Sequence, residues 1–136
     1  MTTEFPSQNM ELTHILVVED IERSKAFYQH VLGASLYRQY GGTSLVFRFN
    51  TAWLLVVTGG GPTKDKPQIV FTAPEDINRA SHAMTIRVPD CAAAYETLRA
   101  RGAEFLTPPV NWDSEIRAFF RDPDGHLFEI SQVDSI

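Results

Sequence analysis

The chain has 136 residues, of which 43% are hydrophobic and 21% charged, and its formal net charge is −5. These values fit one globular domain, or two small repeats that share a core. The acidic balance argues against a nucleic acid or an anionic membrane surface as the partner.

The first half of the chain predicts a strand, a helix and three further strands. Residues 1–10 are polar and aperiodic, which predicts an N-terminal tail, and a strand is expected over 12–18. Asp20 is the residue type of a helix N-cap, and Gly33 that of a helix stop. The three further strands are expected over 35–40, 44–49 and 52–58.

The same order of elements returns in the second half. Residues 59–81 form a connector rich in Gly and Pro, in which 68–72 predicts a short strand. A strand is expected over 82–88, after which Asp90 and Gly102 repeat the helix cap and the helix stop. The remaining strands are expected over 104–106, 115–121 and 126–132.

This repetition determines the predicted fold. The two cap residues, Asp20 and Asp90, are 70 residues apart, so the chain contains an internal repeat. We therefore predict an α+β protein in which two tandem βαβββ modules, 11–58 and 82–133, form curled mixed sheets around a cleft.

The compartment is predicted from the single cysteine and from the absence of apolar runs. One cysteine, Cys91, excludes an internal disulfide and fits a reducing environment. No stretch reaches the length of a transmembrane helix, and the N-terminus lacks the basic-then-apolar pattern of a secretory signal. A cytoplasmic protein without a membrane partner is expected.

A hairpin over residues 119–131 contains the most informative polar residue. The turn Asp122-Pro123-Asp124-Gly125 has turn-forming residues at each position. In the return strand, Phe128 and Ile130 face the core, so alternation places Glu129 on the opposite face. A carboxylate in the middle of a strand is costly to bury without a partner. Glu129 is therefore a candidate catalytic or ligand-binding residue.

Three arginines inside predicted strands, Arg48, Arg87 and Arg117, are candidates for binding an anionic ligand. The alternative is that their head groups are solvated while their stems cover apolar surface. Alternation places Arg87 and Arg117 on the same side of the second sheet as Glu129, so an ion pair with either of them is a structural role open to that carboxylate.

Aromatic residues supply further candidates for a ligand pocket. Trp53 and Phe119 lie in predicted strands, where core packing is the alternative to a binding role. Trp112 lies in a predicted loop over 108–114, and a loop Trp is rarely fully buried. We expect Trp112 to cover the cleft or to contact a partner subunit.

The chain resembles the vicinal oxygen chelate superfamily, also called the glyoxalase / bleomycin-resistance / extradiol-dioxygenase superfamily. Three segments carry the resemblance: VVEDIERSKAFYQHVLG (17–33), RVPD (87–90) and FFRDPDGHLFEIS (119–131). The resemblance implies two βαβββ modules around an open cleft, frequently completed in a homodimer. It also implies a small-molecule ligand, because family members isomerise, cleave or epimerise small molecules with a divalent metal, or sequester drugs without one.

The resemblance also implies where metal ligands are expected. Carried over one position at a time, the family's ligand positions fall on Thr13, Leu55, Ala83 and Glu129. Threonine, leucine and alanine do not suit a metal, so one position of four keeps a ligand type.

A metal site remains open as an alternative because His14 and His82 each lie one residue from a family position. A one-residue slip moves a side chain to the other face of a strand, and a β-bulge at each strand start could restore it. With Glu129 these histidines would suit Fe, Mn, Ni or Zn.

Two functions follow from these observations. The first is a small-molecule binding protein, with a cleft for an aromatic or anionic ligand and without the usual full set of metal ligands. The alternative is a divergent divalent-metal-dependent lyase, isomerase or dioxygenase that uses Glu129 with His14 and His82. A homodimer is expected in either case.

Overall fold

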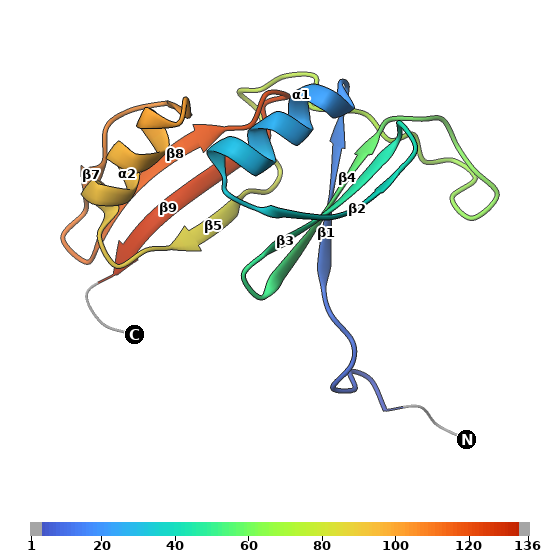
Figure 1. Ribbon diagram of the computed structural model, residues 1–136, viewed down its shortest axis with the longest axis horizontal. Helices are drawn as coiled ribbons and strands as arrows, with labels where there is room; N and C mark the ends of the chain where they lie inside the picture. The colour runs from blue at the N-terminus through green and yellow to red at the C-terminus, as the bar shows by residue number, and fades with distance from the viewer. Residues whose placement is uncertain (1–3, 134–136) are drawn as a thin grey trace.

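The computed structural model describes residues 4–133 and contains two βαβββ modules, as the repeat predicts (Figure 1). In the first module the sheet order is β1-β4-β3-β2, with β1 parallel to β4 and the other pairs antiparallel. Its elements are β1 (Thr13–Val18), α1 (Ile21–Ala26), the π-helical turn η1 (Phe27–Val31), β2 (Ser35–Tyr40), β3 (Ser44–Phe49) and β4 (Ala52–Thr58).

The second module repeats this topology, with the sheet order β5-β9-β8-β6 and β5 parallel to β9, and it adds a fifth strand, β7, paired with β8. Its elements are β5 (Met84–Arg87), α2 (Cys91–Ala100), β6 (Glu104–Phe105), β7 (Val110–Asn111), β8 (Glu115–Arg121) and β9 (Leu127–Val133). The two sheets are not closed into a barrel (Figure 1). Among the described residues no helix is long and apolar enough to cross a membrane.

Both helices begin where the aspartates predict. The Asp20 carboxylate accepts hydrogen bonds from the backbone N–H groups of Glu22 and Arg23, both at 3.1 Å. Asp90 accepts one from Ala93 N at 3.0 Å. These contacts satisfy N–H groups that have no partner within the helix, and such a cap stabilises a helix by about 1 kcal/mol.

The first helix departs from a regular α-helix after Ala26, where it widens into η1. Leu32 N donates to Phe27 O, five residues earlier, at 3.1 Å. Phe27 and Tyr28, which are consecutive, are both buried here, and their rings meet edge to face at 5.1 Å. The spacing of apolar residues in the sequence does not indicate a π-helical turn. One extra residue in the helix leaves that spacing almost unchanged.

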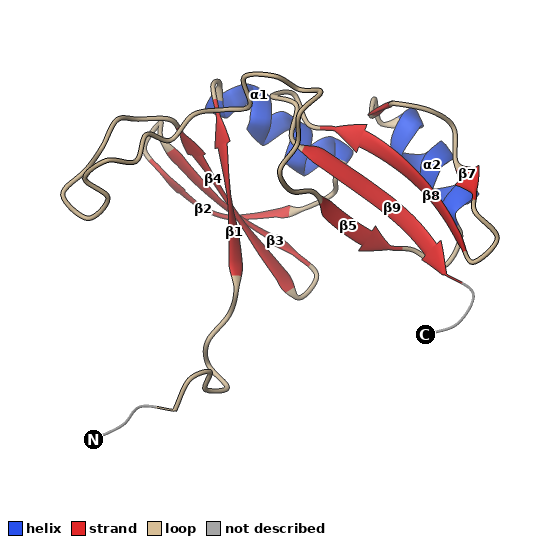
Figure 2. Ribbon diagram, turned by 180° about the vertical axis from the view of Figure 1, so that it is seen from behind, coloured by secondary structure: helices blue, strands red, loops and turns tan. Residues whose placement is uncertain are grey.

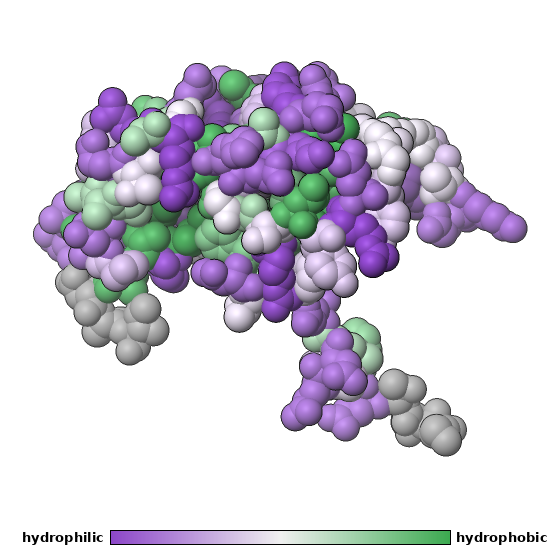
Figure 3. Space-filling model, in the orientation of Figure 1, coloured by the Kyte–Doolittle hydropathy of each residue, from purple (hydrophilic) through white to green (hydrophobic). Residues whose placement is uncertain are grey.

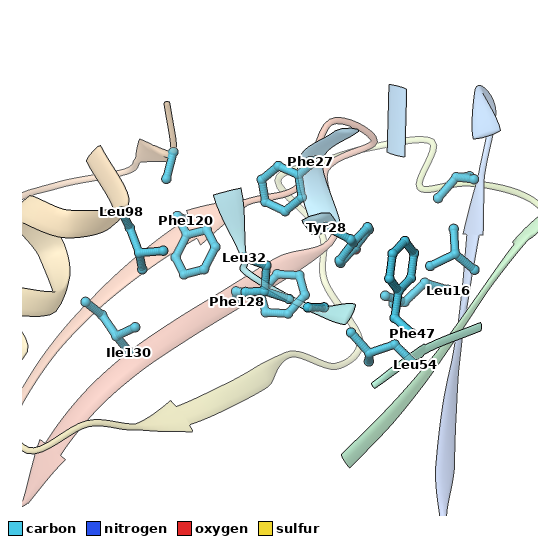
Figure 4. Close-up of a cluster of buried hydrophobic side chains, with 14 of the residues drawn as sticks. Leu16, Phe27, Tyr28, Leu32, Phe47, Leu54, Leu98, Phe120, Phe128 and Ile130 are labelled. Carbon is cyan, nitrogen blue, oxygen red and sulfur yellow. The ribbon is translucent and has the colours of Figure 1, made fainter. Parts of the chain in front are cut away.

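One hydrophobic core joins the modules, and Tyr28 lies at its centre (Figure 4). The Tyr28 ring is 5.5 Å from Phe47 of the first sheet and 6.1 Å from Phe128 of the second, measured between ring centroids. Phe128 stacks on Phe120 at 5.3 Å. Each sheet therefore turns its helix-covered face to this core, and we call the opposite faces the outer faces.

The turn of the 119–131 hairpin fastens the second module to the first. Asp124 Oδ1 accepts from Glu19 N at 2.9 Å and from Arg23 Nη2 at 3.1 Å, next to the N-terminus of α1. Next to it, the buried Asp122 accepts from the hydroxyl of Tyr28 at 2.7 Å. The segment that is most recognisable in the sequence thus also connects the modules.

The connector contains no regular strand, which corrects the prediction of one over 68–72. The connector's contacts include an isolated bridge between Gly60 and Phe71. It also crosses the hairpin turn, where Arg121 Nη2 donates to Asn78 Oδ1 at 3.3 Å. The expected strand over 82–88 is shortened at both ends to β5, so His82 precedes the strand.

Gly125→Val is expected to lower the free energy of unfolding by about 1–3 kcal/mol. Gly125 has φ +99°, a conformation that residues with a β-carbon rarely adopt, and an added Cβ would lie 2.3 Å from Ile77 Cγ2. Gly61→Val is the matched control, because nothing lies within 4 Å of a Cβ there. Urea denaturation measures both, and equal midpoints would contradict the strain at the turn.

Candidate functional site

Glu129 lies on the outer face of the second sheet, as alternation predicts, and its carboxylate is 14% exposed. It accepts a hydrogen bond from the hydroxyl of Thr85, its cross-strand neighbour on β5. Arg117 lies on the other side, with its Nε 3.9 Å from Glu129 Oε2. The sequence left both Arg87 and Arg117 as possible partners of Glu129. In the structure, Glu129 pairs with Arg117.

Arg87 is held by a second carboxylate, Glu115, which the sequence analysis did not single out. Glu115 lies 3.3 Å from Arg87 Nη1 and 3.1 Å from Arg117 Nη1, and it accepts from the hydroxyl of Ser131. The hydrogen bond from Ser131 and the neighbouring Arg117 lower the pKa of the Glu115 carboxyl. Its position two residues before Arg117, on the same face of β8, is the signal that could have identified it.

These four side chains form an Arg–Glu network: Arg87, Glu115, Arg117 and Glu129. Guanidinium groups bind carboxylates or phosphates in a fixed fork, and each carboxylate can accept from a ligand hydroxyl or amine. The two arginines are 53% and 38% exposed, so both can exchange a protein carboxylate for an anionic ligand group. The network thus suits a small polar or anionic group.

Two aromatic candidates border this network. Trp112, which directly follows β7, is 58% exposed, and its ring lies 5.3 Å from the guanidinium carbon of Arg117. β7 is a two-residue strand within the predicted loop, and Val110 pairs with Arg117 on β8. Phe119 is half-buried and is the cross-strand partner of Glu129. Trp112 therefore covers part of the network.

The outer face of the first sheet carries an aromatic cluster around Trp53. Arg48, the cross-strand partner of Trp53, has its guanidinium carbon 4.3 Å from the Trp53 ring centroid. Tyr37 meets Trp53 edge to face at 5.2 Å, and Glu11 lies 3.5 Å from Arg48. A cavity of about 430 Å³ opens here, lined by Glu11, Thr13, Tyr37, Tyr40, Val46, Trp53 and Leu55.

Tyr37 and Tyr40 were not singled out from the sequence. They are 63% and 53% exposed, and the Arg38 guanidinium carbon lies within 6 Å of both ring centroids. The β2–β3 register shifts between Leu36 and Arg38, so simple alternation along β2 does not assign the faces of this strand. The signal available in the sequence was the stretch 37–40, in which three of four residues are aromatic or cationic.

The residues at the family's metal positions do not suit a metal ion. Thr13 and Leu55 both line the cavity on the outer face of the first sheet, and Ala83 immediately precedes β5. Glu129 alone offers a carboxylate, and Thr85 and Arg117 already engage it. Within residues 4–133, no three His, Cys, Asp or Glu side chains are grouped so that they could hold a metal ion.

His14 and His82 do come together, but in a different place from Glu129. Their ring centroids are 4.9 Å apart, and His126 is 6.5 Å from His82. His126 Nε2 lies 2.7 Å from Val17 O at the end of β1. The pairing of β1 with β4 runs without a shift from Thr13 to Val18, so the β-bulge needed to turn His14 to the outer face is not formed.

Stability is expected to fall as the pH falls through about 6.5, the ordinary histidine pKa, and His14 is expected to contribute to this loss. Burial, followed by the neighbouring His82 and His126, lowers the pKa of His14 in the folded protein. The unfolded chain therefore binds the proton at a higher pH than the folded one. Urea midpoints between pH 8 and 5 measure the effect, and His14→Gln should flatten the curve. Parallel curves for both proteins would contradict it.

Comparison with known proteins agrees with the topology. The model of the Glyoxalase/Bleomycin resistance protein/Dioxygenase superfamily matches residues 11–130. The chain is 31% identical over 132 residues to a lactoylglutathione lyase of Salmonella typhimurium, which covers 91% of this chain and 93% of the relative. It is 30% identical over 134 residues to a lactoylglutathione lyase of Haemophilus influenzae, at 93% and 95% coverage.

Solved structures share the fold. A glyoxalase/bleomycin resistance protein/dioxygenase from Nocardioides superposes with a TM-score of 0.74 at 25% identity, over 93% of this chain and 85% of that chain. A glyoxalase-related enzyme from Fulvimarina pelagi superposes with a TM-score of 0.72 at 24% identity, over 93% and 88%.

Proposed function

The chain belongs to the Glyoxalase/Bleomycin resistance protein/Dioxygenase superfamily, and we propose that within it this protein binds a small organic molecule without the usual set of metal ligands. The observation that carries the proposal is the set of residues at the four family positions. Thr13, Leu55 and Ala83 offer no good metal ligand, while Glu129 belongs to the Arg–Glu network. A single carboxylate does not hold a divalent ion tightly.

The ligand class that the outer faces support is a planar aromatic compound with an anionic group. Trp53, Tyr37 and Tyr40 offer ring faces and edges for stacking on the first sheet. Arg48 lies over Trp53 with its guanidinium 35% exposed, and Arg87 and Arg117 provide two more guanidinium groups on the second sheet. Aromatic surface and guanidinium groups together suit aromatic carboxylates and phosphates.

The second candidate function is that of a divalent-metal-dependent lyase, isomerase or dioxygenase. The relatives named lactoylglutathione lyase, at 31% and 30% identity, favour it. It requires Fe, Mn, Ni or Zn, with Glu129, His14 and His82 as the ligand types present in this chain. Within one chain, the positions of these residues do not fit one ion, because the histidines meet each other and His126 but not Glu129.

We further propose a cytoplasmic homodimer. The outer faces leave large apolar side chains exposed, including Tyr37, Tyr40 and Trp112, and a second copy is a natural cover for them. Cys91, the single cysteine, is buried and has no disulfide partner, which supports a reducing compartment.

Elemental analysis of the purified, untagged protein tests the absence of a metal site. We expect clearly less than one transition-metal ion per chain, and the same content in Glu129→Gln, since Glu129 has no metal to hold. The matched control is Glu96→Gln, an exposed carboxylate on α2. About one Fe, Mn, Ni or Zn per chain that is lost in Glu129→Gln alone would favour the metal-dependent enzyme.

Tryptophan fluorescence tests the ligand class with 2-naphthoate as the probe. The two tryptophans, Trp53 and Trp112, border the two candidate surfaces, so binding should change their emission. Arg48→Gln is expected to weaken binding at least about threefold, because a charge-assisted hydrogen bond is lost. Arg99→Gln, on an exposed part of α2, should have no effect. Equal affinities of both variants for naphthoate would contradict the role of Arg48.

A further inference from the structure

Residues 4–11 form an arm that extends from β1 away from the body of the molecule (Figures 1 and 2). The arm exposes Phe5 at 85% and Met10 at 41%, and Leu12 at its root is fully exposed. Large apolar side chains gathered on a projecting segment are costly in water, because each forgoes the stabilisation that burial would give. Burial of these side chains against another surface would therefore be favourable.

An apolar groove of about 820 Å³ lies between the two modules. One wall is the β3–β4 turn with Phe49 and Ala52, and the other is β5 with Met84 and Ile86. Figure 3 shows apolar surface in the middle of the face in view, and the arm projects from the lower side of that face. The size and lining suit an extended peptide segment with bulky side chains.

The charges of arm and groove are complementary. The arm carries two carboxylates, Glu4 and Glu11, and no basic residue. The titratable side chains that line the groove are Arg87 and His14, with no acidic residue among them. Arg87 already pairs with Glu115 but remains 53% exposed, so an arm carboxylate that enters the groove can share its guanidinium.

We propose that the arm of one copy docks in the groove of a second copy. This inference rests on the homodimer proposed above. Each copy presents both an arm and a groove, so a two-fold arrangement makes the contact twice and leaves neither surface uncovered. Thr13, Trp53, Thr85 and Arg87 also line the groove, so the partner's arm would close one side of the ligand-binding surfaces.

Sedimentation equilibrium of two variants tests the docking. Phe5→Asp removes the aromatic anchor of the arm, and Ala52→Glu places a carboxylate in the groove. Each is expected to raise the Kd of the homodimer at least about tenfold, the effect of losing a buried aromatic anchor or of placing like charges together. Leu106→Asp, at an exposed apolar residue outside arm and groove, should leave the Kd within about threefold.

Mixing the two variants separates docking on a second copy from docking within one chain. A heterodimer of Phe5→Asp with Ala52→Glu contains one arm and one groove that are both unaltered, so it should form more tightly than either homodimer. No gain on mixing would overturn docking on a second copy. A dimer that Phe5→Asp leaves unchanged would overturn the role of the arm while the homodimer stands. A wild-type monomer at micromolar concentration would overturn the homodimer itself.

Discussion

Asp122→Ala is expected to lower the free energy of unfolding by about 3–4 kcal/mol, one of the two largest effects that we predict. The carboxylate is 4% exposed and accepts from the Tyr28 hydroxyl at 2.7 Å. Its other oxygen accepts from the backbone N–H groups of Asp124 at 3.0 Å and His126 at 2.8 Å. Alanine removes the acceptor of all three donors, and the Tyr28 hydroxyl and the His126 backbone N–H remain buried without a partner.

Tyr28→Phe separates the hydroxyl from the rest of this network. It removes one donor and keeps the ring that contacts both sheets, so a loss of about 1–2 kcal/mol is expected. Burial and the neighbouring Asp122 raise the pKa of the Tyr28 hydroxyl, which stays protonated and donates. Urea denaturation of both single variants and of the double variant gives their coupling. Additive losses would show that the two side chains act independently.

Phe128→Ala is expected to destabilise the protein by about 3–5 kcal/mol, because it opens a cavity between the modules. The ring is 2% exposed, stacks on Phe120 at 5.3 Å and lies 6.1 Å from Tyr28. It therefore belongs to the contact that makes one core out of two repeats (Figure 4).

The measurement is thermal and urea denaturation of Phe128→Ala beside Leu106→Ala, whose side chain is 46% exposed and should cost less than about 1 kcal/mol. In the variant, the two modules should also lose cooperativity, since the stacked rings transmit stability between them. Two separated unfolding transitions would support this, and a single transition at the wild-type midpoint would contradict the role of Phe128.

The features predicted correctly from the sequence are those that depend on interactions between residues close together in the chain. The caps at Asp20 and Asp90, the turn before Gly125 and the outer face of Glu129 each depend on residues within a few positions of one another. The repeat then predicted the order of the strands and the fold. These features are confirmed because local propensity and the tertiary structure favour the same conformation.

The parts that were missed depend on contacts between distant segments. Glu115 gains its role from Arg87, which is 28 residues away, and β7 exists only because β8 offers it an edge. The short strand expected over 68–72 finds only an isolated bridge to Gly60. His14 and His82 meet across the module boundary, and nothing in either sequence neighbourhood indicates that they do.

The N-termini of the two helices are anchored in different ways. The first helix begins beside Asp124 of the other module, whereas the second is tied to its own sheet, where Cys91 N donates to Gln132 Oε1 at 2.8 Å. Asn50-Thr51 is the β3–β4 turn of the first module, which has no aspartate at this place. The two halves of the repeat thus differ in how their helices are anchored. Fusing two copies of 11–58 would leave both α1 helices without their anchor, while a chain cut within 59–81 keeps the contacts that hold its halves together.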